Sequence, residues 1–346
     1  MARNEPASAS SNAEAWDADV LAAQPNAHYM QSIAWAKTRV GSAWKAHRVR
    51  IKTATNELPV QIFERTAPLI GSIAFLPRVT GITVENVPAI TEHFKKYPKR
   101  FFGAKVETFQ PYDEALVAAF ESAGWVQAAS SQYQHAVMVD LHGTLEEVAA
   151  RFKKRARNSY RVAERNGVTV EKVPMNAENI ATMHRLIDEV KVRSGGYFRH
   201  HEYFEKIWNV YESIGQGHFY FAMYEGEVQS SAFVIRFGDI AWYKDAGSQR
   251  ENNKIFAPYE MQWAIMQDLH AAGVTQYELA NIPDPEEWET SNIRGLYTFK
   301  TAWAREPVKY MPTFEFPISK SRFTIWQKFG RYLRAVYTRR TGDAWY

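Results

Sequence analysis

The 346-residue chain contains no cysteine, which excludes disulfide bonds, thiolate nucleophiles and cysteine metal sites. It has no apolar stretch near the ~20 residues that a membrane-spanning helix requires. Residues 1–13 are rich in Ser, Ala and Asn, without the apolar core of a signal peptide. We therefore predict a soluble cytoplasmic protein with a disordered tail over residues 1–13.

Motifs of several common enzyme classes are absent as well. The chain has no Gly-rich phosphate loop followed by Lys-Ser/Thr, no dinucleotide fingerprint, no Gly-x-Ser-x-Gly elbow and no His-Glu-x-x-His pair. The adjacent His200 and His201 cannot share one helix face, so we expect no metal site at that pair. An enzyme of this composition depends on positioning and on a cation near developing charge.

Aromatic residues are abundant, with 11 Trp, 18 Tyr and 20 Phe, and such residues build either ligand clefts or core. The length favours two domains. The net charge of +4 is modest, but basic residues concentrate at 151–165 and 320–340. This distribution predicts a polyanionic partner, either nucleic acid or an anionic membrane surface.

The first basic cluster lies on a predicted helix, which begins at the capping box Thr144-Leu-Glu-Glu147 and ends at Gly167. Outside its apolar stripe the helix carries Arg151, Lys153, Lys154, Arg155, Arg157, Arg161 and Arg165. Acidic neighbours that could form ion pairs with these residues are scarce. The basic face of the helix is therefore either exposed to solvent or a binding surface for phosphates, and the sequence leaves both interpretations open. The second cluster lies on an amphipathic helix over 321–340, which can pack on the first domain, lie on anionic lipid or contact RNA.

One phrase occurs twice. Pro111-Tyr112 opens a helix that ends at Gly124, and Pro258-Tyr259 opens one that ends at Gly273, each followed by a strand. Either the chain contains two copies of one α/β module, or a common helix pattern recurs. Short apolar or alternating runs predict strands near 47–53, 60–64, 72–77, 101–109, 168–173, 218–224, 228–237 and 240–247.

The stretch Arg294–Trp303 follows an acidic, turn-rich segment, so we expect a loop that presents Lys300 between Phe299 and Trp303. An ammonium among aromatic rings stabilises developing negative charge better than one in water. The alternative is a lysine that extends along a core strand. Arg199 and Tyr203 lie four residues apart and would meet on a helix, as a phosphate-binding pair or as a surface pair.

Several sequence motifs, in the order in which they occur between about residues 29 and 318, resemble those of the FemABX family of aminoacyl-tRNA-dependent transferases, which build peptidoglycan bridges. They are Ser32-x-x-Trp35-x-Lys37, Gln134-x-x-x-Met-Val-Asp140-Leu141, Phe152-Lys-Lys-Arg155-x-Arg157-x-x-Tyr160, Tyr243-x-x-Ala246-Gly-Ser, Pro258 and Gly295-Leu-x-x-Phe299-Lys300.

The resemblance implies an α/β (α+β) fold of two tandem modules like acyl-CoA N-acyltransferases (GNAT), each a mixed, mainly antiparallel sheet flanked by helices. We expect the modules at 14–143 and 144–318, and a basic C-terminal helix within 319–346 that packs on the first module. No heptad run is present, so the chain resembles the compact type without a coiled-coil arm.

The implied reaction is attack by a stem-peptide amine on the ester of aminoacyl-tRNA. The acceptor is lipid II or UDP-MurNAc-pentapeptide. No cofactor is expected beyond aminoacyl-tRNA as co-substrate. We expect a monomer in the cytoplasm, in peripheral contact with the inner membrane leaflet. An acetyl-CoA-type N-acyltransferase, tRNA-dependent acylation of another peptide amine, and a non-catalytic RNA- or membrane-binding protein are the alternatives. A pure binding module gives no reason for Lys300 in an aromatic loop.

By this resemblance, Lys300 stabilises the oxyanion or the leaving ribose oxygen, and Phe299 orients the adenosine end of the tRNA. Lys37, on a helix capped by Ser32 and beside Trp35, contacts phosphates of the precursor. The other implied substrate residues are Arg199 and Tyr203, with a related duty, and Tyr243, which lines the acceptor channel. The expected tRNA-binding residues are Arg151, Lys153, Lys154, Arg155, Arg157 and Arg161.

Overall fold

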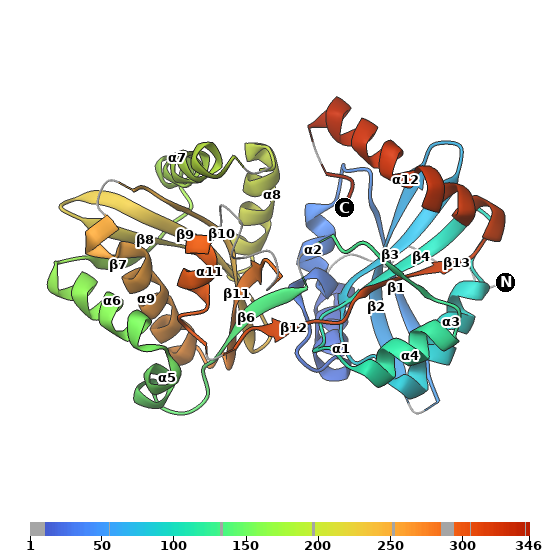
Figure 1. The fold of residues 1–346 in the computed structure, drawn as a ribbon, viewed down its shortest axis with the longest axis horizontal. Coiled ribbons are helices and arrows are strands. Elements are labelled where there is room, and N and C mark those ends of the chain that lie inside the picture. Colours follow the sequence, from blue (N-terminus) through green and yellow to red (C-terminus); the bar gives the residue numbers. More distant parts are fainter. Residues whose placement is uncertain are drawn as a thin grey trace. The chain divides into compact units, whose positions relative to one another are not determined.

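The computed structural model describes residues 11–54, 56–131, 134–195, 198–250, 253–284, 294–304, 306–342 and 344–346. The chain divides into two compact units, one formed by Met1–Ser130 with Met311–Tyr337 and the other by Ser131–Tyr310 with Thr338–Tyr346. Figure 1 shows the elements of both units. Of the predicted disordered tail, residues 1–10 lie outside the described part, and a helix already begins at Ser11.

The first unit contains one mixed sheet with helices on both faces. Its strands are β1 (Lys45–Lys52), β2 (Glu57–Ala67), β3 (Gly71–Val79), β4 (Phe101–Thr108), β5 (Val126–Ala128) and β13 (Thr313–Pro317). Its helices are α1 (Ser11–Ala23), α2 (Ile33–Thr38), α3 (Val87–Lys95), α4 (Glu114–Ser122) and α12 (Lys320–Thr341), with short 3₁₀ turns at Tyr29–Gln31 and Val84–Asn86. The boundary between the units falls within α12, which belongs to the first unit as far as Tyr337. The sheet order is β1-β2-β3-β4-β13-β5 among the described strands.

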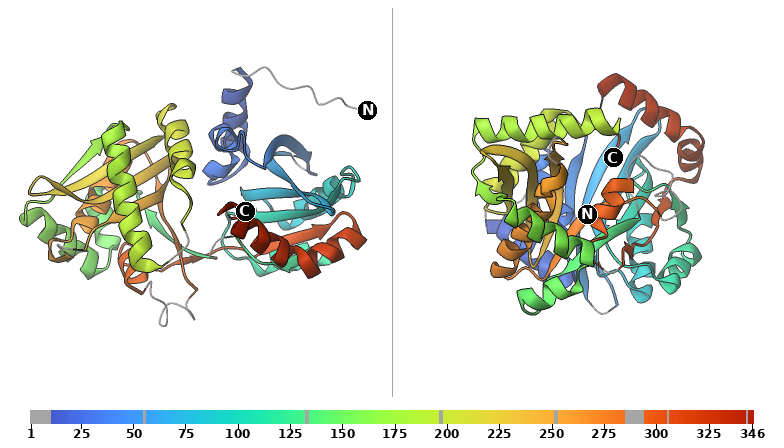
Figure 2. Two further views of the ribbon diagram at one scale, coloured as in Figure 1. Left: turned by 90° about the horizontal axis from the view of Figure 1, so that it is seen from above. Right: turned by 60° about the vertical axis from the view of Figure 1, so that its left-hand side comes forward.

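The first core forms where α3 and α4 cover one face of this sheet, around Phe94, Val106 and Phe120. Helix α12 covers the other face, where Phe323 contacts Gly103 and the Trp326 ring lies 5.2 Å from that of Phe102 (Figures 1 and 2). A Cβ on Gly103 would lie 3.0 Å from Phe323, so this close approach of helix and strand favours glycine.

The second unit repeats this layered arrangement. Its strands are β6 (His135–Asp140), β7 (Thr169–Val173), β8 (Gly217–Tyr224), β9 (Glu227–Phe237), β10 (Ile240–Ser248), β11 (Gln276–Ile282) and β12 (Val308–Lys309). Its helices are α5 (Leu145–Arg151), α6 (Lys154–Arg165), α7 (Ala177–Ser194), α8 (His201–Glu212), α9 (Ala257–Ala271) and α11 (Arg294–Lys300), with a 3₁₀ turn at Asn253–Ile255. The described strands are ordered β12-β6-β11-β10-β9-β8-β7.

Alternating strand residues separate the two faces of the second sheet. Tyr220, Val234 and Tyr277 point into the core under α6 and α9. Phe219 and Phe233 point to the opposite face, where they meet Trp208 of α8. None of the helices that the structure describes combines the length and the hydropathy that a membrane span needs.

The two sheets share one pairing pattern, which confirms the predicted fold class of two tandem GNAT-like modules. Among the described strands of each sheet, one parallel pair lies among antiparallel pairs: β3 with β4, and β10 with β11. The repeated Pro-Tyr phrase does not mark equivalent elements, however. Helix α9 connects the parallel strands β10 and β11, and its counterpart between β3 and β4 is α3, whereas the phrase singled out α4.

Two strands lie outside the domains in which the sequence placed them. We expected residues 131–143 in the first domain and 311–318 in the second, but β6 pairs in the second sheet and β13 pairs with β4 and β5 in the first. Such long-range strand pairing leaves no local signal in the sequence. The predicted single helix from Thr144 to Gly167 is also wrong: it breaks at Phe152, whose backbone is extended (φ −72°, ψ 150°).

Candidate functional site

The parallel strands β10 and β11 of the second unit pair only along their first residues. Their register runs from Ile240 opposite Gln276 to Trp242 opposite Glu278 and ends there. Beyond this point β10 continues beside β9 and β11 beside β6, each after a register shift. Ala280, in β11, adopts φ of +60°, an uncommon conformation for a residue with a side chain. The main-chain N–H and C=O groups on the facing edges of β10 and β11 beyond this point therefore need hydrogen-bond partners other than each other.

Lys300 supplies one such partner. The residue is only 6% exposed, and its Nζ donates a hydrogen bond of 2.9 Å to the main-chain oxygen of Asn281 in β11. It is the last residue of α11, so the expected loop around Lys300 is wrong and a short helix presents it. Residues 285–293, which include most of the predicted acidic loop, lie outside the described part.

Burial lowers the pKa of Lys300 to about 8, against the opposing influence of the Glu278 carboxylate. The ammonium remains predominantly protonated at pH 7, and two of its three N–H groups are not used by Asn281. A buried cation with spare donors can stabilise an oxyanion that forms within its reach.

Phe299 belongs to a cluster of aromatic rings beside Lys300. Its ring meets Tyr259 edge-on at 5.0 Å and Trp303 edge-on at 6.5 Å. Phe152 packs against Trp303 at 5.1 Å, and this contact accounts for the break between α5 and α6. Phe299 is only partly buried, so one part of its ring contributes to the core and another remains available to a ligand.

The N-terminus of α6 adjoins this cluster, because the main-chain N–H of Lys153 donates to Ala302 at 3.0 Å. The side chains of Lys153 and Lys154 are exposed there. A helix N-terminus with two lysines favours anions such as phosphate.

The other predicted tRNA-binding residues also make contacts within the second unit. Arg151 donates to the main-chain oxygens of Asp140 and His142, Arg155 to the Tyr259 hydroxyl and Arg157 to Ala150. The guanidinium of Arg161 lies 5.8 Å from the centre of the Tyr160 ring. Arg151, Arg155 and Arg157 therefore stabilise the local structure through these hydrogen bonds, independently of any ligand.

A second cationic group lies at the other flank of the strand separation. The Tyr203 ring lies 4.8 Å from the Arg199 guanidinium and 6.0 Å from the Lys244 ammonium. Arg199 precedes α8, so it meets Tyr203 from the preceding segment and not on one helix as we expected. Its guanidinium also donates to main-chain oxygens of Ala344 and Tyr346.

Lys244 was missed by the sequence analysis. It lies at the register shift in β10, and its Nζ bonds to Asp245 at 2.9 Å, which in turn accepts from Trp208 Nε1 at 2.9 Å. Such an irregularity re-aims a strand side chain. The signal was a Lys-Asp pair directly after Tyr243 in an otherwise apolar strand.

Tyr243 points into the core shared with α9, where burial raises its pKa above the ordinary range.

In the first unit, Trp35 is buried between the Tyr29 ring at 5.4 Å and the Arg39 guanidinium at 4.1 Å. Lys37 is exposed on α2, and the predicted Ser32 cap is confirmed by its bond to the Trp35 N–H. The structure therefore groups Lys300 with Phe299, and Arg199 with Tyr203, within the second unit.

No group of three or more His, Asp or Glu side chains suited to a metal ion occurs in the described part of the chain. The adjacent histidines have separate environments: His201 bonds to Asp188, and its ring stacks on that of His184 at 3.8 Å.

The model of the FemAB family matches residues 19–226 and 218–330. The chain belongs to this family. It is 20% identical to the lipid II:glycine glycyltransferase of Staphylococcus saprophyticus, over 90% of this chain and 93% of that protein. Membership identifies an enzyme of the transferase class and supports, at the level of the family, an aminoacyltransferase of peptidoglycan bridge formation.

Solved structures agree on the fold. A crystal structure of FemX has a TM-score of 0.77 at 18% identity, covering 91% of this chain and 97% of the other. The C-terminal domain of a putative lysylphosphatidylglycerol synthetase from Agrobacterium fabrum has a TM-score of 0.50 at 16% identity, covering 89% and 92%.

Proposed function

We propose that this FemAB-family protein transfers an amino acid from aminoacyl-tRNA to an amine of the peptidoglycan stem peptide, on lipid II or UDP-MurNAc-pentapeptide. The amine nitrogen attacks the ester carbonyl, and the tetrahedral intermediate collapses to an amide. The bond to the ribose oxygen breaks, and that oxygen takes up the proton that the amine releases. The reaction needs no cofactor beyond the charged tRNA.

Lys300 is the observation that carries this proposal. A buried ammonium, held on the Asn281 oxygen where β10 and β11 stop pairing, has donors to spare for the oxyanion or the ribose oxygen. Phe299 beside it offers part of an aromatic ring to the terminal adenosine. Lys153 and Lys154, next to Ala302, suit the phosphates that precede that adenosine.

The acceptor carries phosphates, and the second cationic group suits them. On either side of Tyr203, the Arg199 guanidinium can donate two parallel hydrogen bonds to a phosphate, and the Lys244 ammonium supplies a compact positive charge. A phosphate at Arg199 would take the place of the main-chain oxygens of Ala344 and Tyr346. We assign Lys37 and Trp35 of the first unit to the same acceptor, and Tyr243 to its stem peptide, on the family resemblance.

The test incubates the pure protein with labelled aminoacyl-tRNAs, pooled and then singly, with each of the two precursors. We expect label to move from one tRNA to one precursor, which would name the amino acid and the acceptor together. Deacylated tRNA is the control. Consumption of acetyl-CoA with no transfer from any tRNA would overturn the proposal and leave the fold assignment intact.

We also propose that the protein works as a monomer in the cytoplasm, at the inner face of the membrane when the acceptor is lipid-linked. Sedimentation of the pure protein and fractionation of cells test these two statements directly.

A further inference from the structure

Helix α12 of the first unit carries a second apolar face. Its inner face, with Phe323, Trp326 and Gly330, is buried. Four large apolar side chains on its outer side remain exposed: Ile325 45%, Phe329 55%, Tyr332 55% and Val336 48%. Because they follow one another at intervals of four, three and four residues, they share one side of the helix. A single exposed apolar residue is ordinary, whereas an aligned stripe indicates a binding surface.

The charge of α12 restricts what can cover this stripe. Over Lys320–Thr341 the helix has no Asp or Glu, and its cations are Lys320, Arg322, Lys328, Arg331, Arg334, Arg339 and Arg340. An apolar stripe bordered only by Lys and Arg complements a surface that is apolar inside and anionic at its boundary. A bilayer with anionic lipids is such a surface.

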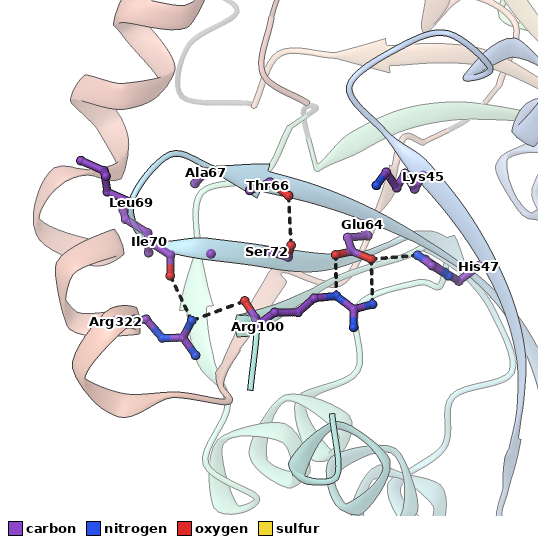
Figure 3. Close-up of a pocket in the computed structure, with 11 residues that line it drawn as sticks. Lys45, His47, Glu64, Thr66, Ala67, Leu69, Ile70, Ser72, Arg100 and Arg322 are labelled. Carbon is purple, nitrogen blue, oxygen red and sulfur yellow. Dashed lines mark hydrogen bonds and ion pairs between the residues drawn. The ribbon is translucent and has the colours of Figure 1, made fainter. Parts of the chain in front are cut away.

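A cationic pocket of about 720 Å³ lies beside the first turn of α12 (Figure 3). Arg322 lines the pocket and donates to the main-chain oxygen of Ile70 at 3.2 Å. Ile325 is three residues from Arg322, so the pocket and the stripe adjoin on the helix surface. Leu69, at the β2–β3 turn, is fully exposed next to this turn of α12 and adopts φ of +64°. A strained turn that exposes a leucine suggests a functional contact.

The pocket favours an anion. Its carboxylate, Glu64, is already bound by Arg100 at 3.0 and 3.2 Å and by His47 at 3.0 Å (Figure 3). Three cations, Lys45, Arg100 and Arg322, stand against this one carboxylate, so the formal net charge of the pocket is positive even when His47 is left out of the count. The exposed ammonium of Lys45 has no ion-pair partner within the described residues.

We propose that this surface of the first unit binds an anionic phospholipid bilayer, with the α12 stripe and Leu69 in the interface and a lipid phosphate in the pocket. This inference rests on the proposed function and adds to it the surface that contacts the inner leaflet. RNA is the less suitable occupant. Phe329 and Tyr332 can stack on bases, but Ile325, Val336 and Leu69 on the same surface neither stack on bases nor contact phosphates.

The apolar stripe is tested by flotation of the full-length protein with vesicles, without tRNA or precursor. Vesicles of phosphatidylglycerol and phosphatidylcholine are compared with phosphatidylcholine alone. The triple variant I325S/F329S/V336S is expected to lower binding to the anionic vesicles by at least about tenfold. Val192→Ser is the matched control, since Val192 is 84% exposed on α7 of the other unit. Unchanged melting temperatures verify folding.

The pocket is tested with Lys45→Gln, against Lys52→Gln at the other end of the same strand, where the side chain is 85% exposed. We expect binding to anionic vesicles to fall roughly fivefold for Lys45→Gln. The control should bind as the parent protein does, because Lys52 lies outside the pocket.

Three outcomes would overturn the inference: equal binding to neutral and anionic vesicles, equal losses in test and control variants, or no vesicle binding with retardation of tRNA that the α12 variants abolish. Where the parent protein accepts the water-soluble nucleotide precursor, aminoacyl transfer to it should persist in every variant. A protein that floats with vesicles but transfers nothing would instead contradict the proposed function alone.

Discussion

The two sheets of this protein have the same pairing pattern, yet their parallel pairs differ at one place. In the first unit, β3 and β4 pair again after a register shift, at Val79 opposite Thr108. In the second unit, β10 and β11 do not pair beyond Trp242 and Glu278. A repeated fold thus has one copy with a restored ladder and one with separated strands.

Each unit also buries one lysine near this pair, among the residues that the structure describes. Lys105 of β4 donates to Ala129 at 2.9 Å and forms an ion pair with Glu107 at 3.4 Å. Lys300 donates to Asn281 at 2.9 Å and reaches its strand from a separate helix. The difference teaches that burial of a lysine does not by itself indicate a catalytic role; the role that we propose for Lys300 rests on its place at an unpaired strand end.

The substitution Lys300→Met is the most direct test of the difference that we propose between the two buried lysines. We expect the rate of aminoacyl transfer to fall about 100- to 1000-fold, because a preorganised donor to the oxyanion is lost. The protein should remain folded, since methionine fills a similar volume. Single-turnover transfer and circular dichroism are the measurements, and an unchanged rate would refute the role of Lys300.

Lys105→Met is the counterpart in the first unit. It should destabilise the protein by about 3 kcal/mol, because the buried ion pair between Lys105 and Glu107 is broken by removal of one of its two charges. The single-turnover rate of the folded fraction should stay within about twofold of the parent. Urea unfolding measures the first effect; a large loss of rate in folded protein would mean that both lysines serve the chemistry.

The pH dependence of the unfolding free energy is a further test of the burial of Lys300. Lys300 has a pKa of about 8 when folded, below the usual 10.5, so the unfolded chain binds the extra proton between these values. Stability therefore rises with pH from about 8 to about 10.5, by up to about 3 kcal/mol in total from this group. The difference in unfolding free energy between the parent and Lys300→Met should change by this amount across that range. A constant difference would contradict the assigned burial.

The smallest expected effect concerns the second cationic group. Arg199→Gln should raise the KM for the precursor about tenfold with little change in kcat, because the contact that we propose for the guanidinium is with the acceptor and not with the reacting atoms. Arg185→Gln is the control, since Arg185 is an exposed arginine paired with Glu189 on α7. An equal rise in the KM for aminoacyl-tRNA would move Arg199 to the donor side.

Local elements were predictable because their signals are local. The capping box of Thr144 and Glu147 is present, and the strands predicted near 218–224 and 228–237 are present as the paired strands β8 and β9. Errors arose where tertiary contacts override local pattern. The helix from Thr144 breaks so that Phe152 can pack on Trp303, and a segment expected to be a loop forms α11.

The candidate site was predictable only in part. Order and spacing of motifs named Lys300, Phe299, Arg199 and Tyr203, and the structure groups them as two pairs at the separated strands. Lys244 was not found, because its direction depends on the irregularity in β10, which has no sequence signature of its own.

The sequence by itself determined the family, the two-module class and most helix and strand types, since caps, periodicity and motif order act over short distances. Only the tertiary structure decided that β13 joins the first sheet and that Lys300 meets the Asn281 oxygen. Both depend on residues far apart in the chain, whose pairing is selected by burial and by the need of each main-chain group for a partner.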